Sequence, residues 1–325
     1  MERAHWQDKR VLITGCTGFL GSWLAGQLVN LGADVVGLIR DEVPQSMLLH
    51  DGTVNKIKIV HGELCDYPLL ERTLAEYEIH TIFHLAAQTI VGIANRSPMH
   101  TFETNIRGTW MLLEAARQNP TVKAIVVASS EKAYGDKHPL PFVETMPLAG
   151  RHPYDVSKSC ADLISQMYAH TYQLPVSVTR CSNLYGGGDL NWNRLLPGTI
   201  RSVLRGEPPI IRSDGTFKRD YLYVEDAVTG YLMIAEQLAN TAVKGECYNF
   251  GKGDPNTALD VVNTIIKVSD HPHLEPVILN EVQNEIKDEY LSSQKAHKTL
   301  GWYPQDTLET GLAKTMSWYR QFLKI

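Results

Sequence analysis

Short apolar runs alternate with longer amphipathic segments over the first 180 residues. The runs are rich in Val and Ile, as expected for strands that are buried on both faces of a parallel sheet. The segments between them have the length and apolar spacing of helices. We predict strands at 11–14, 34–39, 58–61, 81–85, 124–129 and 176–180, and helices at 21–31, 69–77, 102–119 and 154–172. This alternation is typical of an α/β fold in which helices cover a parallel sheet.

The pattern changes after residue 180. A Gly-Gly-Gly-Asp run at 186–189 interrupts it, and residues 181–220 are rich in Pro, Gly and Arg, which indicates binding loops with a helix at 196–205. An apolar run at 246–251 predicts a strand that returns to the sheet. Further helices are expected at 258–268 and 307–322. We therefore predict a Rossmann-type doubly wound parallel sheet built from residues 1–180 and 221–252, with a smaller C-terminal substrate-binding lobe built from 181–220 and 253–325.

Bulk composition narrows the function classes. The chain has 325 residues, 43% of them hydrophobic, and a formal net charge of −5, so neither nucleic acid nor an anionic membrane is an expected partner. The N-terminus lacks an apolar signal core, and no run approaches the roughly 18 to 20 apolar residues that span a membrane. The five cysteines are scattered without metal-ligand spacing, which predicts a reducing, cytoplasmic location and no metal site.

Two motifs carry the chemistry. The glycine-rich segment 15–21 follows a predicted strand and opens a predicted helix, a context that brings backbone N–H groups against a pyrophosphate. Tyr154 and Lys158 lie four residues apart on a helix, so the ammonium can favour the ionised phenol. Each motif alone has a plainer interpretation, an ordinary strand-to-helix turn or a solvated surface pair. Together, and with Ser129 and Ser130 between them, they indicate nicotinamide chemistry.

With these motifs the chain resembles the extended branch of the short-chain dehydrogenase/reductase family, the nucleotide-sugar epimerases and dehydratases. The resemblance covers essentially the whole chain. Segments 84–91, 180–189 and 193–197 look most like CDP-glucose 4,6-dehydratases. The segments that match the family are 14–21, 84–88, 104–109, 129–130, 154–158, 219–221, 224–226 and 301–304.

The resemblance implies a catalytic set of Ser130, Glu131, Lys132, Tyr154 and Lys158. In 4,6-dehydratases an acid and a base follow the active-site Ser or Thr, and the CDP-glucose enzymes have Asp-Lys there. This chain has Glu-Lys, so the acid is one methylene longer. Glu131 is the expected acid, and Lys132 is a candidate base only if burial or a neighbouring cation lowers its pKa. A surface ion pair is the alternative for both.

The implied reaction converts an NDP-hexose to an NDP-4-keto-6-deoxyhexose with tightly bound, internally recycled NAD(P). NADP is favoured over NAD, because Ile39 stands where NAD-preferring relatives have Asp and Arg40 suits a 2′-phosphate, although Asp41 could take the ribose instead. Glu63 and Leu64 either hold adenine or simply end a strand. The full set of expected cofactor contacts is Gly15, Thr17, Gly18, Phe19, Leu20, Gly21, Arg40, Glu63, Leu64, Leu85, Ala86, Ala87, Gln88, Asn105, Tyr154 and Lys158.

For the nucleotide diphosphate, Arg219 is the leading candidate because a guanidinium binds phosphate oxygens bidentately. The expected substrate contacts are Gln88, Ser130, Asn183, Arg194, Arg212 and Arg219, with solvated loop arginines and a turn asparagine as alternatives. Two other functions stay open, a 4-epimerase using the same tyrosine and a redox-sensing protein that binds cofactor without turnover. The resemblance also implies a homodimer that pairs helices 102–119 and 154–172 of each subunit.

Overall fold

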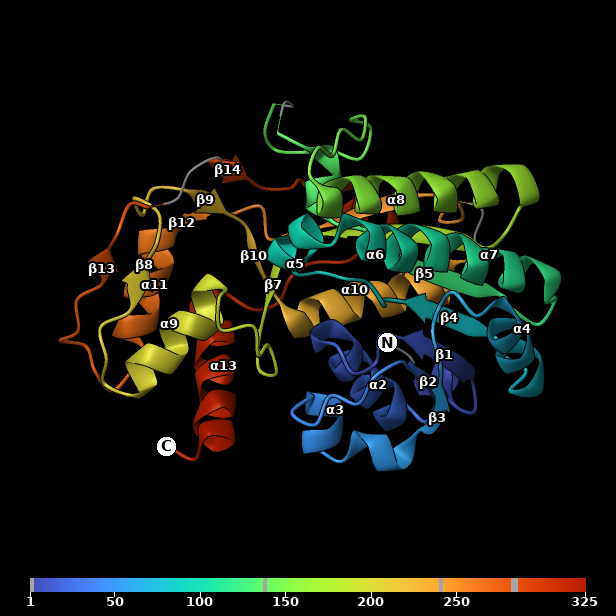
Figure 1. The fold of residues 1–325 in the computed structure, drawn as a ribbon, viewed down its shortest axis with the longest axis horizontal. Coiled ribbons are helices and arrows are strands. Elements are labelled where there is room, and N and C mark those ends of the chain that lie inside the picture. The colour runs from blue at the N-terminus through green and yellow to red at the C-terminus, as the bar shows by residue number, and fades with distance from the viewer. Residues whose placement is uncertain (1–2, 137–138, 240–241, 282–285) are drawn as a thin grey trace.

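In a computed structural model, which describes residues 3–136, 139–239, 242–281 and 286–325, a seven-stranded sheet is covered by helices on both faces (Figure 1). The strand order is β11-β6-β5-β4-β1-β2-β3, and every neighbouring pair is parallel. This confirms the predicted fold class. The strands are β1 (Arg10–Thr14), β2 (Asp34–Ile39), β3 (Lys58–His61), β4 (Thr81–His84), β5 (Ala124–Ala128), β6 (Val176–Cys181) and β11 (Cys247–Phe250).

Alternate residues of the central strands supply two hydrophobic cores, one on each side of the sheet. In β1, Val11 and Ile13 pack with α2 and α10, whereas Leu12 packs with α4, α7 and α8. Figure 1 shows α7 and α8 above the sheet and α2 and α10 below it. The helices around the sheet are α1 (Arg3–Trp6), α2 (Phe19–Asn30), α3 (Met47–His50), α4 (Tyr67–Glu76), α5 (Val91–Arg96), α6 (Pro98–Phe102), α7 (Gly108–Gln118), α8 (Pro153–Tyr172), α10 (Val224–Gln237) and α12 (Gln294–Leu300), with 3₁₀ turns η1 (Thr53–Lys56) and η3 (Glu131–Tyr134).

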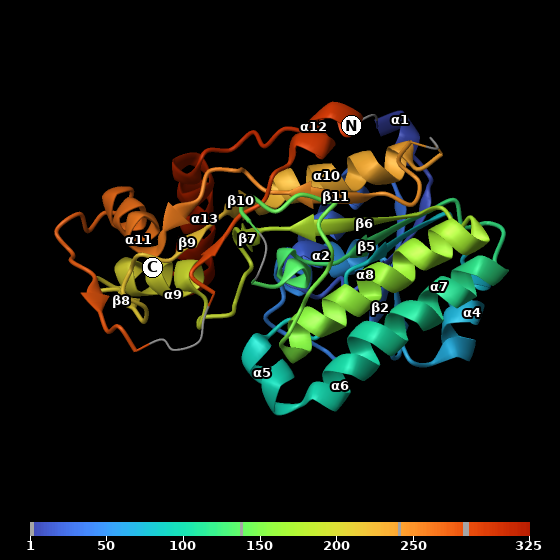
Figure 2. The same ribbon diagram turned by 90° about the horizontal axis from the view of Figure 1, so that it is seen from above.

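A third hydrophobic core lies in a lobe beside the sheet (Figure 2). The lobe contains α9 (Leu195–Leu204), α11 (Ala258–Lys267) and α13 (Leu308–Leu323). Its small sheets are formed by β8 (Ile210–Ile211) with β13 (Val277–Ile278), and by β9 (Lys218–Arg219) with β12 (Asn256–Thr257) and β14 (Asp288–Glu289). A further pair, β7 (Asn183–Tyr185) with β10 (Tyr221–Tyr223), leads from the main sheet to the lobe.

The glycine run at 186–188 joins the two parts of the molecule. Trp23 of α2 donates its Nε1–H to the carbonyl oxygen of Gly187 at 2.7 Å. A Cβ at Gly187 would collide with the ring of Trp318 on α13. The turn is therefore fixed from both sides, by a helix of the sheet layer and by a helix of the lobe.

One predicted helix is wrong in detail. The segment expected as a single helix at 102–119 consists of α6, a π-helical turn η2 (Glu103–Arg107) and α7. The π turn contains Asn105, whose side chain is 2% exposed and hydrogen-bonded to two other segments. Such turns frequently occur at functional sites.

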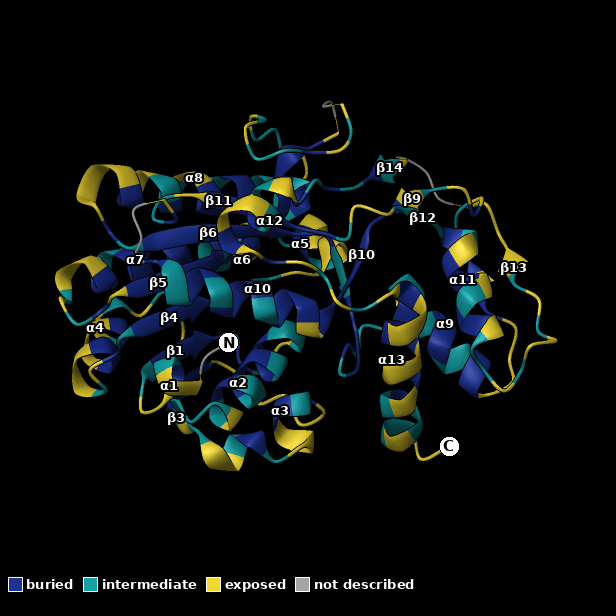
Figure 3. Ribbon diagram, turned by 180° about the vertical axis from the view of Figure 1, so that it is seen from behind, coloured by how far each residue is buried: buried dark blue, intermediate teal, exposed yellow. Residues whose placement is uncertain are grey.

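Burial follows the layered plan, with the sheet strands dark and the outer helix faces exposed (Figure 3). No helix among the described residues is long and apolar enough to cross a bilayer.

Candidate active site

The glycine-rich turn leaves the end of β1 and opens α2. Gly15 has a φ of +77°, and a Cβ there would lie 2.7 Å from the backbone nitrogen of Ala86. A Cβ at Gly21 would collide with the carbonyl oxygen of Gly15, so the helix can approach the turn only without a side chain. Gly18 is the N-cap of α2, and no side chain caps the helix. The backbone N–H groups of the first turn are thus available to an anion, which fits the pyrophosphate of a dinucleotide.

The ends of β2 and β3 hold the residues expected near the adenosine. Ile39 is buried, whereas Arg40 is exposed and its Nε lies 2.6 Å from Oδ2 of Asp41. After β3, Glu63 is exposed and Leu64 is buried against the start of α7, where a Cβ at Gly108 would lie 2.8 Å from Leu64 Cβ.

A buried polar chain fixes the loop after β4. His84 Nε2 lies 2.9 Å from Thr109 Oγ1, which donates to the carbonyl oxygen of Asn105 at 2.6 Å. His84 Nδ1 lies 2.8 Å from Thr14 Oγ1, which in turn accepts from the N–H of Leu85 at 3.2 Å. Because the Thr109 proton is used on Asn105, Nε2 of His84 carries the ring proton. Burial lowers the pKa of His84 to about 3, so the ring is neutral.

Asn105 joins this loop to the helix of the predicted tyrosine. Its Oδ1 accepts from the N–H of Gln88 at 2.7 Å, and its Nδ2 donates to the carbonyl oxygen of Gln88 at 3.1 Å. Nδ2 also lies 2.9 Å from Ser157 Oγ, and Ser157 donates to the carbonyl oxygen of Tyr154 at 2.7 Å. The segment expected to contact the cofactor and the start of α8 are therefore held by one amide.

Tyr154 is the second residue of α8 and is 9% exposed. Burial raises the pKa of its phenol, while a hydrogen bond from Ser130 and the positive charges of Lys132 and Arg194 act to lower it. Lys158 lies one turn further along α8, is 5% exposed and donates from Nζ to the carbonyl oxygen of Ala128 at 2.7 Å. Burial lowers the pKa of Lys158 to about 8.

Glu131 is the first residue of η3, directly after Ser130, and is 2% exposed. Its Oε1 accepts from Asn183 Nδ2 at 2.8 Å, whereas Oε2 is buried and has no hydrogen-bond partner among the described residues. Burial and then the carboxylate of Glu289 raise the pKa of Glu131 well above the usual carboxyl value. The raised pKa favours the protonated carboxylic acid over the carboxylate, and Oε2 is the oxygen without a hydrogen-bond partner within the described protein.

Lys132 does not pair with Glu131. Its Nζ lies 2.9 Å and 3.2 Å from the two carboxylate oxygens of Glu289, whose side chain is fully buried. Burial acts to lower the pKa of Lys132, but the carboxyl groups of Glu289 and Glu131 raise it, and the net direction is upward. A lysine base needs the opposite direction. The lowered pKa on which the role of Lys132 as a base depends is therefore not found here, because the buried Glu289 carboxylate favours the ammonium form.

The predicted substrate residues come from the lobe and its connections. Arg219 is 8% exposed; its Nε lies 3.3 Å from Glu289 Oε2, and its other nitrogens donate to the carbonyl oxygens of Ile286 and Lys287 at 2.6 and 2.8 Å. Arg194 lies at the start of α9 and pairs with Asp189 at 2.6 Å, close enough to Tyr154 for its charge to act on the phenol.

Arg212 is exposed at the end of β8, and only its backbone oxygen has a described contact in this region, from the N–H of Glu281 at 2.8 Å. The structure thus brings Asn183 and Arg194 to the Ser130–Tyr154 region and leaves Arg212 on the lobe surface.

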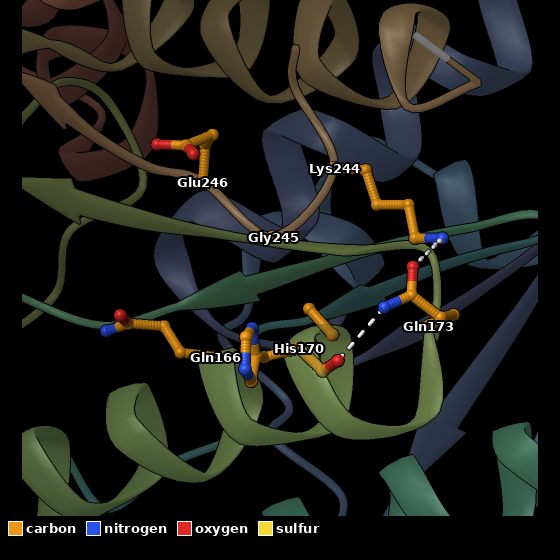
Figure 4. Close-up of a pocket in the computed structure, with 7 residues that line it drawn as sticks. Gln166, His170, Gln173, Lys244, Gly245 and Glu246 are labelled. Atoms are coloured by element: carbon orange, nitrogen blue, oxygen red, sulfur yellow. Dashed lines mark hydrogen bonds between the residues drawn. The ribbon is translucent and has the colours of Figure 1, made fainter. Parts of the chain in front are cut away.

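Two surface hollows lie elsewhere. One, of about 260 Å³, lies between the end of α8 and the loop before β11, and its lining includes His170, Gln173 and Lys244 (Figure 4). Lys244 Nζ donates to Gln173 Oε1 at 3.1 Å across it. A second hollow adjoins it and shares Gln166 and Glu246. Neither lining includes a predicted site residue.

Sequence reasoning missed Glu289, the carboxylate that joins Lys132 to Arg219. It lies in the two-residue strand β14, 157 positions from Lys132 along the chain. Locally the sequence shows only an acidic pair, Asp288 and Glu289, in a polar stretch. No spacing or motif there distinguishes a buried acid from a solvated one.

Fold and site together define a dinucleotide-binding enzyme scaffold with a tyrosine on a long helix and a buried acid beside it. A family model described as GDP-mannose 4,6 dehydratase matches residues 12–315. The chain belongs to this family, which confirms the resemblance to nucleotide-sugar epimerases and dehydratases.

Individual relatives cover nearly the whole chain. A CDP-glucose 4,6-dehydratase of Salmonella typhimurium is 29% identical over 349 aligned residues, covering 100% of this chain and 94% of the relative. The solved UDP-glucose 4-epimerase of Thermotoga maritima, in complex with UDP-glucose, superposes with a TM-score of 0.88 at 28% identity, covering 97% and 99% of the two chains. The dTDP-glucose 4,6-dehydratase of Bacillus anthracis, in complex with NAD, has a TM-score of 0.83 at 28% identity, covering 96% and 97%.

Proposed function

We propose that the protein is a nucleotide-sugar 4,6-dehydratase, which converts an NDP-hexose to an NDP-4-keto-6-deoxyhexose. The observation that carries the proposal is the place of Glu131, a buried carboxyl group directly after Ser130 whose Oε2 has no hydrogen-bond partner among the described residues and whose raised pKa favours its protonated form. Expulsion of a sugar hydroxyl as water needs such a proton donor in position. Membership of the family and the similarity to a CDP-glucose 4,6-dehydratase support the same reaction.

In the first step Tyr154 removes the proton of the sugar 4-hydroxyl, and Ser130 hydrogen-bonds the same oxygen. A bound nicotinamide would supply the acceptor for the C4 hydride and the donor of that hydride to C6. The positive charges of Lys132 and Arg194 favour the phenolate, against the effect of burial. Lys158, one turn along α8, is proposed to add a further positive charge on the same helix face.

In the elimination step the C4 ketone acidifies the C5 proton. The C5 proton leaves to a base, which returns it to C5 when hydride adds to C6. The Lys132 ammonium stabilises the negative charge that spreads onto the C4 oxygen between these two transfers. Glu131 then donates its proton from Oε2 to the C6 hydroxyl, which leaves as water. Asn183 determines which oxygen of Glu131 donates the proton. Its amide N–H donates to Oε1, so Oε2 is the oxygen that carries the proton toward the C6 hydroxyl.

The chain fits a dinucleotide at the open turn after β1 and along the loop after β4. Arg40, exposed after β2 where Ile39 leaves no carboxylate at the strand end, favours NADP over NAD. Because the hydride is returned within each turnover, we infer tight binding of the cofactor.

For the diphosphate of the substrate we propose Arg194 and Arg219, with Arg212 reaching in from the lobe surface.

A 4-epimerase is the second candidate, and the likeness to the UDP-glucose 4-epimerase of Thermotoga maritima favours it. An epimerase would use Tyr154 in the same way, release the ketone from the tyrosine and reduce it from the other face. It has no step that consumes the proton of Glu131. The buried acid therefore favours the dehydratase.

We also infer a homodimer and a cytoplasmic location. Trp110 on α7 and Leu163 and Met167 on α8 are 40%, 55% and 41% exposed, on two helices that pack against one another. Covering these apolar side chains with the same helices of a second copy would form a four-helix contact.

The five free cysteines, Cys16, Cys65, Cys160, Cys181 and Cys247, fit a reducing compartment.

The experiment that tests the function incubates the purified protein with CDP-glucose, GDP-mannose, UDP-glucose or dTDP-glucose, each with NAD or NADP, and weighs the products by mass spectrometry. We expect one sugar nucleotide to lose one water. An unchanged mass with an inverted stereocentre would establish the epimerase instead, and no conversion of any sugar nucleotide would favour a binding protein. Tyr154→Phe is the matched control, since it should remain folded and convert nothing.

A further inference from the structure

Glu289 is the one carboxylate that contacts both Lys132 and Arg219 among the described residues. It lies in β14, paired in parallel with β9 so that Glu289 is opposite Arg219. Its side chain is fully buried. Both oxygens accept from Lys132 Nζ, at 2.9 and 3.2 Å, and Oε2 lies 3.3 Å from Arg219 Nε. A buried carboxylate held by two cations is a fixed negative charge.

That charge lies close to the proposed acid. The groups whose charges act on Glu131 are Glu289, Lys132, Asp220 and Arg219, and the thiol of Cys181 and the amide of Asn183 also face it. Asp155 of α8 is within reach of the charges of Lys132 and Glu289.

Asp220 is held separately. Its two oxygens accept from the backbone N–H groups of Lys252 at 3.0 Å and Gly253 at 3.1 Å. Glu289 is thus the carboxylate that compensates Lys132.

The contacts of Glu289 with Lys132 determine which of the two carboxyl groups, Glu131 or Glu289, is more easily protonated. An uncompensated ammonium at Lys132 would favour ionisation of Glu131. Glu289 pairs with the Lys132 ammonium and with Arg219, so its carboxylate is a negative charge in the same buried site as Glu131, and like charges there disfavour ionisation of the second group. Glu289 is the largest cause after burial for the raised pKa of Glu131.

We propose, building on the proposed dehydratase function, that Glu289 is a positioning residue: its buried carboxylate holds the Lys132 ammonium in place and supplies the negative charge beside which Glu131 keeps its proton. Glu289 touches neither substrate nor cofactor in this proposal. It acts on elimination through Glu131 and Lys132. Tyr154 and Ser130 carry out the oxidation at C4, which Glu289 affects only through the charge of Lys132 on the phenol.

The test uses Glu289→Gln, which removes the negative charge of the side chain and keeps its shape. Water elimination requires protonated Glu131, so its rate falls as pH rises through the pKa of that group. Removing the neighbouring negative charge lowers this pKa, and the falling limb of the pH–rate profile should move to lower pH by about one unit or more. Glu289→Asp, which keeps the charge, should return the limb toward the wild-type position. Glu144→Gln, at a half-buried carboxylate that accepts from the N–H of Asn249 at 2.8 Å, should leave it unmoved.

A second measurement reads the proton without any turnover. The protein is labelled with carbon-13 at its glutamate carboxyl carbons, and the Glu131 signal is assigned by its loss in Glu131→Gln. In wild type this signal should stay at its protonated position through neutral pH, and in Glu289→Gln it should titrate at lower pH. Lys132→Met removes a positive charge instead and should move the titration to higher pH.

The two measurements separate the two hypotheses. If the Glu131 signal shifts in opposite directions in the two variants but no sugar nucleotide loses water, the role of Glu289 stands and the dehydratase is wrong. If water is lost but neither the pH limb nor the signal moves in Glu289→Gln, the role of Glu289 is wrong and the dehydratase stands. Should Glu289→Gln fail to fold, Glu289→Met removes the same charge, and a Glu131 titration that stays at the wild-type position in that variant would overturn the proposal.

Discussion

Glu131 links protein stability to the chemistry of the site through a single proton. In the unfolded chain its carboxyl group ionises near the usual carboxyl pH, whereas in the folded chain burial raises its pKa well above that value. Between these two pKa values the folded state binds more protons than the unfolded state. Stability therefore falls as pH rises through this window, and the group costs most at neutral pH and above. A residue that destabilises the fold at the pH of the reaction is typical of a functional site.

Glu131→Gln should accordingly separate stability from activity. Glutamine matches the shape of the protonated acid and cannot ionise, so the variant should melt at a higher temperature than wild type at pH 8, with the difference vanishing below about pH 4, near the ordinary glutamate pKa. It cannot donate the proton to the C6 hydroxyl, so water elimination should slow by about 10²- to 10⁴-fold. Melting curves at several pH values and the rate of water loss measure the two effects. A variant that melted lower than wild type at pH 8 would contradict the buried, protonated state of Glu131.

A functional residue could be predicted when a short sequence motif marks it, and not when its role depends on a partner far away in the sequence. Gly15, Ser130 and Tyr154 could be identified from the sequence because each follows a strand or begins a helix in a short recognisable motif. The contact between Lys132 and Glu289 could not, because 157 positions separate them and the small strands that bring them together are two residues long. The direction of the Lys132 pKa depends on that distant partner, so the sequence alone could not show whether Lys132 has the lowered pKa that a lysine base needs.

In helix α2, two glycines in one turn-and-a-half of helix have different surroundings. A Cβ at Gly21 would collide with the carbonyl oxygen of Gly15, in the turn that we assign to the pyrophosphate. A Cβ at Gly26 would meet only Thr53 Oγ1, at 3.7 Å, an ordinary contact. The same substitution at the two positions therefore tests whether close packing of the turn on the helix is needed.

Gly21→Ala should lower stability by about 1 to 3 kcal/mol, because the backbone must shift to accept the methyl group. It should also weaken dinucleotide binding by about tenfold or more, since the same shift moves the N–H groups of the turn. Gly26→Ala is the control, and it should raise stability by about 0.5 to 1 kcal/mol because alanine is the better helix former. Calorimetric titration with NAD and NADP and chemical unfolding give both quantities. Equal dinucleotide affinity in Gly21→Ala and wild type would show that the turn does not bind the cofactor.

The principal elements could be predicted from the apolar pattern alone. Each helix buries one apolar stripe against the sheet, and each sheet strand buries both of its faces. The helix expected at 154–172 is α8, Pro153–Tyr172, and the strand expected at 34–39 is β2. The π turn at Glu103–Arg107 could not be predicted, because it is associated with hydrogen bonds of Asn105 to Gln88 and Ser157 rather than with local spacing. The short lobe strands were missed for a similar reason, since two-residue strands have no periodicity.

Over the whole molecule, the exposed apolar side chains are not evenly spread. Trp110, Leu163 and Met167 lie on α7 and α8, the helix pair on the outer face of the sheet layer. A second group, Val277 and Ile278, lies on β13 at the edge of the lobe, 46% and 44% exposed. The sequence indicated long helices that could serve as an interface, but only the packed structure identifies which residues face outward.

Leu163→Glu tests the proposed dimer at the centre of this face. Leu163 is 55% exposed in the single chain, so the charge should leave the folded monomer as stable as wild type while opposing burial against a second copy. We expect light scattering after size-exclusion chromatography to give twice the chain mass for wild type at micromolar concentration and the mass of one chain for Leu163→Glu. Ile278→Glu introduces the same charge at a comparably exposed residue of the lobe and should remain dimeric. If wild type has the mass of a single chain, the dimer proposal fails; if only Ile278→Glu dissociates, the interface lies on the lobe instead of the α7–α8 face.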